Sequence, residues 1–192
     1  LLVFTEDYRI TGDSLQEMMF FHVDAGKLQS VLEHLKEGHT IEGESLKAKA
    51  DFLLGSGVES AWGKNVPEME MKEMEEMTKI GTGYFLTTPV FDLDKFAKFI
   101  QHTNTFGVPV VAEVMILRTA GMARFLNRHL KSGLVPDWII QKLARAPDKQ
   151  KASIEIFTDI VSGLKDLCQG VHIITIGAEE KLKLYLDAAK LK

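Results

Sequence analysis

The chain has 192 residues, of which 45% are hydrophobic and 26% are charged. These proportions are typical of one globular domain and exclude a disordered chain or a disulfide scaffold. A formal net charge of −4 gives no electrostatic basis for binding nucleic acid, and no apolar run reaches the length of about 18 residues that a membrane span needs. Because Cys168 is the only cysteine and no Cys or His spacing fits a zinc site, we expect a cytoplasmic protein without a metal.

The first half of the chain alternates short apolar runs with amphipathic stretches. Residues 1–4 form an apolar run that predicts a strand, and residues 12–23 are ambiguous and are expected to be a loop. Asp24 is a suitable N-cap for a helix that Gly38 ends. A second strand is expected at 52–55, a polar loop at 56–67, and a helix at 68–79. The apolar residues of that helix repeat at helical spacing and indicate a core face: Met71, Met74, Met77 and Ile80.

The second half continues the same alternation. Strands are expected at 84–87, 108–117 and 171–176, and helices at 93–101 and 179–189. Thr119 can cap another helix, and Pro136 and Pro147 delimit a short helix that precedes a longer one at 149–167. Apolar strands that alternate with amphipathic helices predict an α/β domain with a parallel sheet. Two architectures fit one domain over residues 1–192: part of a (β/α)8 TIM barrel, or a five-stranded doubly wound sheet.

In both architectures the chemistry lies where the strands end, on the loops that follow them. Asp7 follows the first strand, and a carboxylate there can hold two N–H groups of a pterin-like ring. Glu113 lies within an apolar strand, where it is either a working acid or the buried partner of Arg118 or a lysine. Glu59 could face the same end of the sheet as these residues, but it is interpreted as a solvated loop acid. His172 is interpreted as a hydrogen-bonded core histidine rather than a ligand.

Four segments, taken in order, resemble the methylenetetrahydrofolate reductase family, specifically its short bacterial form. The first is Thr5-Glu6-Asp7, which is similar to the end of the fourth barrel strand of that family. The second is the run from Gly81 to Asp92, whose Thr87-Thr88-Pro89-Val90-Phe91-Asp92 is similar to the family's TQPVFD sequence. The third runs from Val108 through Leu117 to Asn127, and the fourth consists of Val135-Pro136-Asp137 and 170–177. The match covers strands four to eight of the barrel, so that the first three β/α units are missing.

The resemblance implies an oxidoreductase that reduces 5,10-methylenetetrahydrofolate to 5-methyltetrahydrofolate by hydride transfer from a flavin, FAD or FMN, in one-carbon metabolism. Asp7 matches the family's substrate-contacting aspartate, and Thr88 stands where the family has a substrate-binding glutamine. The implied flavin-binding residues are Thr5, Glu6, Asp7 and Gly57. The family's catalytic acid is a glutamate on the first barrel strand, which this chain lacks, so Glu113 is the only candidate for that role here.

Two alternatives to an independent reductase follow from the same residues. Glu73, Glu75 and Glu76 stand where the family often has basic residues, which favours a folate-binding or complex-forming barrel subunit without flavin or catalysis. A flavodoxin-like FMN carrier would need a phosphate loop where the acidic residues 5–8 stand. A sheet of five barrel strands has two apolar edges, so we expect either a longer protein or a second chain that closes it. We therefore expect a homo-oligomer or a subunit of a larger redox complex.

Overall fold

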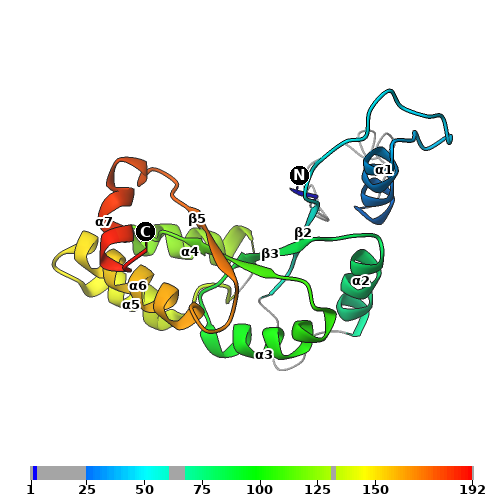
Figure 1. Cartoon of the computed structure of the whole chain (residues 1–192). Coiled ribbons are helices and arrows are strands. Elements are labelled where there is room, and N and C mark those ends of the chain that lie inside the picture. The colour runs from blue at the N-terminus through cyan, green and yellow to red at the C-terminus, as the bar shows by residue number, and fades with distance from the viewer. Residues whose placement is uncertain (1, 4–24, 61–67, 131–132, 192) are drawn as a thin grey trace, which may run out of the picture.

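The structure is a computed structural model that describes residues 2–3, 25–60, 68–130 and 133–191. Strands and helices alternate along most of the chain (Figure 1). In chain order the elements are β1 (Leu2–Val3), α1 (Ala25–Glu37), β2 (Gly55–Val58), α2 (Glu68–Lys79), β3 (Tyr84–Pro89), α3 (Leu93–Thr103), η2 (Asn104–Phe106), β4 (Val110–Met115), α4 (Ala120–His129), α5 (Asp137–Arg145), α6 (Lys149–Leu164), β5 (Gly170–Ile174), η3 (Glu179–Lys181) and α7 (Leu182–Ala188).

The five strands form one parallel sheet in the order β1-β2-β3-β4-β5. Spatial order thus equals chain order, as it does around a (β/α) barrel. A doubly wound sheet instead reverses its strand order at a switch point. The strand order therefore favours the partial (β/α)8 barrel over the doubly wound alternative, and it confirms the predicted α/β class.

The core lies between the sheet and the helices. Side chains alternate between the two faces of a strand, and on β4 the helix-facing Val110, Ala112 and Val114 are all buried. Helix α6 packs against β4 and contacts α3. The face of the sheet turned away from this core is called the inner face below, because in a barrel it faces the axis.

A buried polar contact ties α7 to α6. The hydroxyl oxygens of Ser153 and Tyr185 lie 2.9 Å apart, and both residues are buried. The ring of Tyr185 also meets Phe157 edge to face, with a centroid separation of 5.5 Å. This contact holds α7 against α6.

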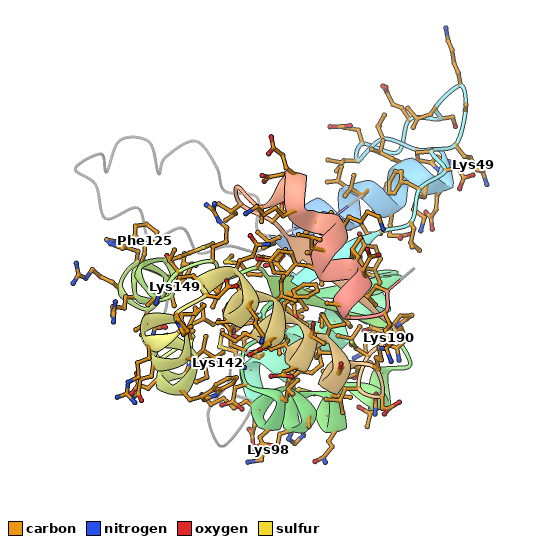
Figure 2. All side chains as sticks on the ribbon, turned by 90° about the vertical axis from the view of Figure 1, so that its left-hand side faces the viewer. Lys49, Lys98, Phe125, Lys142, Lys149 and Lys190 are labelled. Atoms are coloured by element: carbon orange, nitrogen blue, oxygen red, sulfur yellow. The ribbon has the colours of Figure 1, made fainter. Side chains whose placement is uncertain are left out.

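The outer surface of the helical layer is charged (Figure 2). Lys142 of α5 bridges two carboxylates of α6, Glu155 at 3.2 Å and Asp159 at 3.7 Å. Phe125 of α4 is an exposed apolar side chain that stacks on His129 one turn later. Among the described residues, no helix combines the length and apolarity that crossing a membrane would demand.

The structure corrects the position of the second strand. The apolar run 52–55 predicted a strand there, but β2 spans Gly55–Val58 and Leu53 is 64% exposed. Gly55 pairs with Tyr84 of β3, whose ring occupies the space that a side chain at position 55 would need. Glycine has a low intrinsic preference for strands. It is suited to position 55 because the neighbouring Tyr84 ring leaves no room for a side chain. Helix α2, by contrast, has the predicted bounds, with Met74 and Met77 buried.

Candidate functional site

Four neighbouring strands bring polar side chains to the inner face. Gly55 and Gly57 of β2 are on the inner face, so alternation along the chain places Glu59, which follows β2, on the same face. On β4 the inner position between Ala112 and Val114 is Glu113. Directly opposed residues of paired strands share a face, so His172 of β5, which pairs with Glu113, is also on the inner face. Together with Thr88 of β3, these residues form what we call the polar row: Glu59, Thr88, Glu113 and His172.

One half of the polar row is centred on the Thr88 hydroxyl. It donates to Glu59 Oε1 at 2.8 Å and accepts the backbone N–H of Ser60 at 3.2 Å. The Ser60 hydroxyl donates to the Thr88 carbonyl at 3.3 Å. The sequence-based interpretation of Glu59 as a solvated acid is therefore wrong, because this carboxylate is half-buried and held by Thr88. Sequence reasoning lacked the strand register, which continues from Val58 opposite Thr87 to Glu59 beside Thr88.

A change of register gives Thr88 this position. Leu86 pairs with Val111, but Pro89 pairs with Glu113, so β3 has one residue more than β4 between these two pairs. The Thr87 hydroxyl accepts the Glu113 N–H at 3.2 Å, which closes the ladder across the irregular stretch. Bulges of this kind re-aim side chains at barrel rims and active sites. The irregularity therefore separates the role of Thr87, which supports the backbone, from that of Thr88, which faces the polar row.

The other half of the polar row is an acid–imidazole pair. Glu113 Oε2 lies 3.2 Å from His172 Nδ1. The Glu113 side chain is 13% exposed and that of His172 is 54% exposed. A partner of Glu113 is thus an imidazole of the next strand, which the sequence did not suggest. His172 is not a core histidine, because its strand position turns it away from the helices.

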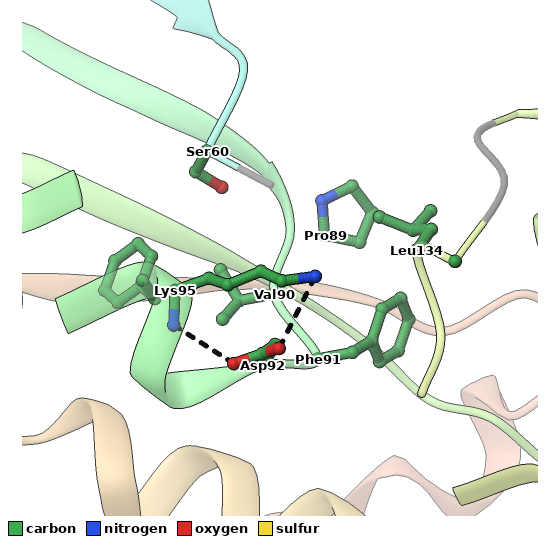
Figure 3. A pocket seen from close by; sticks show the side chains of 9 residues that line it. Ser60, Pro89, Val90, Phe91, Asp92, Lys95 and Leu134 are labelled. Carbon is green, nitrogen blue, oxygen red and sulfur yellow. Dashed lines mark hydrogen bonds and ion pairs between the residues drawn. The ribbon is translucent and has the colours of Figure 1, made fainter. Parts of the chain in front are cut away.

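Most of the segment that resembles the family's TQPVFD sequence has a structural role. Val90 and Phe91 are buried in the core. Asp92 is the N-cap of α3: its carboxylate accepts the Lys95 N–H at 3.0 Å and lies 3.5 Å from Lys95 Nζ (Figure 3). The pocket beside these residues has a volume of about 10 Å³, room for one water and far too little for a folate. From this segment, Thr88 contributes a polar side chain to the polar row.

Other family-like residues hold loops in place. The side-chain amide of Asn127 donates to the Val135 carbonyl at 2.9 Å and accepts the Val135 N–H at 2.7 Å, which fastens the connection from α4 to α5. Thr119 is the N-cap of α4, as predicted, with its hydroxyl 3.1 Å from the Met122 nitrogen. Both side chains therefore support the backbone at the two ends of α4.

Two ionisable groups near the ends of β5 have shifted pKa values. Hydrogen bonds from backbone N–H groups, including that of Gly177, and from the Thr175 hydroxyl lower the pKa of Glu179 below its ordinary value. Burial raises the pKa of the Cys168 thiol, which donates to the carbonyls of Leu164 and Gly170. Cys168 is therefore a poor nucleophile at neutral pH. In the described part of the chain, no group of three His, Cys, Asp or Glu residues is arranged to hold a metal ion.

The predicted flavin-binding residues receive little support from the described residues. Thr5, Glu6 and Asp7, the last also a predicted substrate contact, lie outside the described part of the chain. Gly57 is in β2 on the inner face, paired with Leu86, and is buried. The polar row offers two carboxylates and one imidazole, and carboxylates repel the phosphates of a flavin nucleotide. The polar row therefore does not fit the phosphate end of a flavin.

Comparison with known proteins identifies the family of the chain. Residues 59–190 match the family model described as methylenetetrahydrofolate reductase. A search of curated proteins gives no significant match. One solved structure that matches this chain is an uncharacterized protein from Clostridium thermocellum that binds two copies of 5-methyl-5,6,7,8-tetrahydrofolic acid. It is 19% identical with a TM-score of 0.44, and the match covers 73% of this chain and 54% of that one, so the chain spans about half its length. With its sequential parallel sheet and a family match over more than half of its residues, the chain belongs to the methylenetetrahydrofolate reductase family.

Proposed function

We propose that this chain forms the folate-binding wall of an oxidoreductase that reduces 5,10-methylenetetrahydrofolate to 5-methyltetrahydrofolate. The observation that carries the proposal is the family match over residues 59–190, which includes every member of the polar row. In the proposed site the reduced pterin lies against the inner face, with Thr88 as one contact and Asp7 as another. When bound, a flavin would supply the hydride.

The role of Thr88 rests on its hydroxyl, which Glu59 and Ser60 hold in one orientation. A threonine offers a single donor and a further acceptor site, so Glu59 is positioned to add the acceptor that recognition of ring N–H groups requires. Because the Thr88 proton is donated to Glu59, the pair Thr88–Glu59 presents acceptors, which suit the ring N–H groups of a pterin. Glu59 thereby takes a binding role that the sequence allowed but did not favour.

Titration of the full chain with 5-methyltetrahydrofolate, the proposed product, tests the binding part of the proposal. Wild type should bind, and Thr88→Val should lower the affinity by about 5- to 10-fold, the equivalent of one hydrogen bond. Thr105→Val is the matched control, because Thr105 is exposed and lies beyond α3. Equal affinities for wild type and Thr88→Val would remove Thr88 from the site.

The role of Asp7 is tested by Asp7→Asn in the same titration. If Asp7 holds the pterin through a charged pair, the binding free energy should weaken by about 1.5–3 kcal/mol. Folate binding that the substitution leaves unchanged would exclude that contact.

A second candidate function is a folate-binding or complex-forming subunit without flavin. It is favoured by α2, whose exposed face presents Glu73, Glu75 and Glu76, with Glu75 paired to Lys79 at 2.7 Å. The visible absorption spectrum of the purified chain, with and without added FAD or FMN, separates the two. Bound flavin supports the reductase, whereas folate binding with no flavin at micromolar concentration supports the subunit.

The proposed reductase or subunit would act in the cytoplasm, as a homo-oligomer or within a larger redox complex. Light scattering on the purified chain gives its mass in solution. A chain that is monomeric in solution and forms no complex with an added electron-transfer protein would contradict this part of the proposal.

A further inference from the structure

The contact between Glu113 and His172 fixes which ring nitrogen of the imidazole carries a hydrogen. A carboxylate has only acceptors, so the nitrogen that faces it, Nδ1, is the donor across 3.2 Å. In a neutral imidazole the other nitrogen, Nε2, is then an acceptor. Glu113 thereby determines the hydrogen-bonding character of the opposite edge of the ring.

The exposure of the two side chains shows which of them a ligand can reach. Glu113 is 13% exposed, whereas His172 is 54% exposed. A molecule on the inner face would therefore meet the imidazole before the carboxylate. The imidazole lies two strands from Thr88, a separation of about 10 Å at the usual strand spacing, which a fused two-ring system with its edge groups can bridge.

The chemistry of a reduced pterin matches this edge. A tetrahydropterin carries ring N–H groups and an exocyclic amino group, all of them hydrogen-bond donors, and a neutral Nε2 accepts one such bond. We propose that His172 Nε2 is a contact for an N–H donor of the folate pterin, and that Glu113 is the positioning residue that holds the imidazole in the accepting tautomer. This inference rests on the proposed folate-binding function and adds a contact from β5 to it.

Two substitutions separate the two ring nitrogens. In His172→Asn the amide can keep the hydrogen bond to Glu113 but has no atom at the place of Nε2, while in His172→Gln the longer side chain can present an amide oxygen there. Titration of the full chain with 5-methyltetrahydrofolate should give an affinity about 5- to 10-fold lower for His172→Asn. For His172→Gln it should stay within about threefold of wild type. His102→Asn is the control, because this exposed histidine of α3 lies away from the inner face.

A spectroscopic measurement reports on the tautomer itself. Nitrogen-15 NMR of the histidine rings should show Nδ1 of His172 protonated and Nε2 unprotonated in the free protein. Addition of 5-methyltetrahydrofolate should shift the Nε2 resonance, and in Glu113→Ala the preference for the Nδ1–H tautomer should weaken. A purely structural pair would leave Nε2 unchanged on ligand addition.

The outcomes distinguish this inference from the function on which it rests. If wild type fails to bind 5-methyltetrahydrofolate, the proposed function and this contact both fail. If wild type binds but His172→Asn binds equally well, or the Nε2 resonance does not move, only the contact from His172 is overturned. A loss of affinity that His172→Gln shares in full would also overturn it, because the effect would then not depend on an acceptor at the Nε2 position.

Discussion

Removing the two hydroxyls of the buried pair Ser153–Tyr185 one at a time should cost more in total than removing both together. The two oxygens lie 2.9 Å apart and each residue is 1% exposed, so water cannot replace a lost partner. A net hydrogen bond contributes about 0.5–1.5 kcal/mol, and an abandoned buried hydroxyl costs about 1–3 kcal/mol. Tyr185→Phe keeps the ring against Phe157, so we expect a loss of about 1–2 kcal/mol in the free energy of unfolding, and a similar loss for Ser153→Ala.

Urea unfolding of both single variants and of the double variant forms a double-mutant cycle. In the double variant neither hydroxyl is left without a partner, so its loss should be smaller than the sum of the single losses by at least about 1 kcal/mol. The denaturant slope should be the same in all four proteins, which shows that the stability changed and the unfolded state did not. Strictly additive losses would refute the reasoning, because they would mean that the two hydroxyls do not depend on each other.

Four further predictions concern the framework around the polar row. Gly55→Ala should lower the free energy of unfolding in urea by about 1–3 kcal/mol, because its Cβ would overlap the Tyr84 ring, and a neutral result would mean that the ring moves aside freely. Asp92→Ala should cost about 0.5–2 kcal/mol in the same assay through loss of the α3 N-cap, with Asp92→Asn as the control that retains it, so equal losses would refute the capping role. Because the pKa of Glu179 is lowered in the folded state, its carboxylate stabilises the fold above the ordinary glutamate pKa, and this contribution is lost as pH falls through the lowered pKa. A carbon-13 NMR titration of the carboxyl group should give a midpoint below the ordinary glutamate value. An ordinary midpoint would contradict this prediction. Cys168 should react with iodoacetamide at pH 7 far more slowly in the folded chain than in urea, since burial raises its pKa, and equal rates would show a mobile thiol.

Helices were predictable from the sequence to the extent that local signals set their ends. Helix α2 has the predicted bounds because its methionines repeat at helical spacing and Gly81, with a positive φ of 100°, ends the segment. The strand β2 was not predictable in the same way. Two of its four residues are glycines. Gly55 is required there because the Tyr84 ring, from a strand distant in sequence, fills the space beside it. Local apolarity pointed instead to residues 52–55, of which Leu53 is exposed.

The residues of the candidate site could be predicted from the sequence, but the contacts between them could not. Thr88 and Glu113 were named from the sequence, and both lie in the polar row. The contacts from Thr88 to Glu59 and from Glu113 to His172 depend on register between strands that are distant in sequence. An apolar neighbourhood also made His172 resemble a core residue, whereas alternation along β5 turns it to the other face. Which face a polar residue occupies becomes clear only when the partner strand is known.

The polar row depends on the alternation of side chains between the two faces of β4. Ala112, Glu113 and Val114 occupy helix-facing, inner and helix-facing positions in turn. Deleting or inserting one residue early in β4 would exchange these faces. A carboxylate would then enter the layer between sheet and helices, while an aliphatic side chain would stand opposite His172. Loops of this protein can therefore vary in length more freely than β4, where one residue gained or lost would disrupt the core and the polar row together.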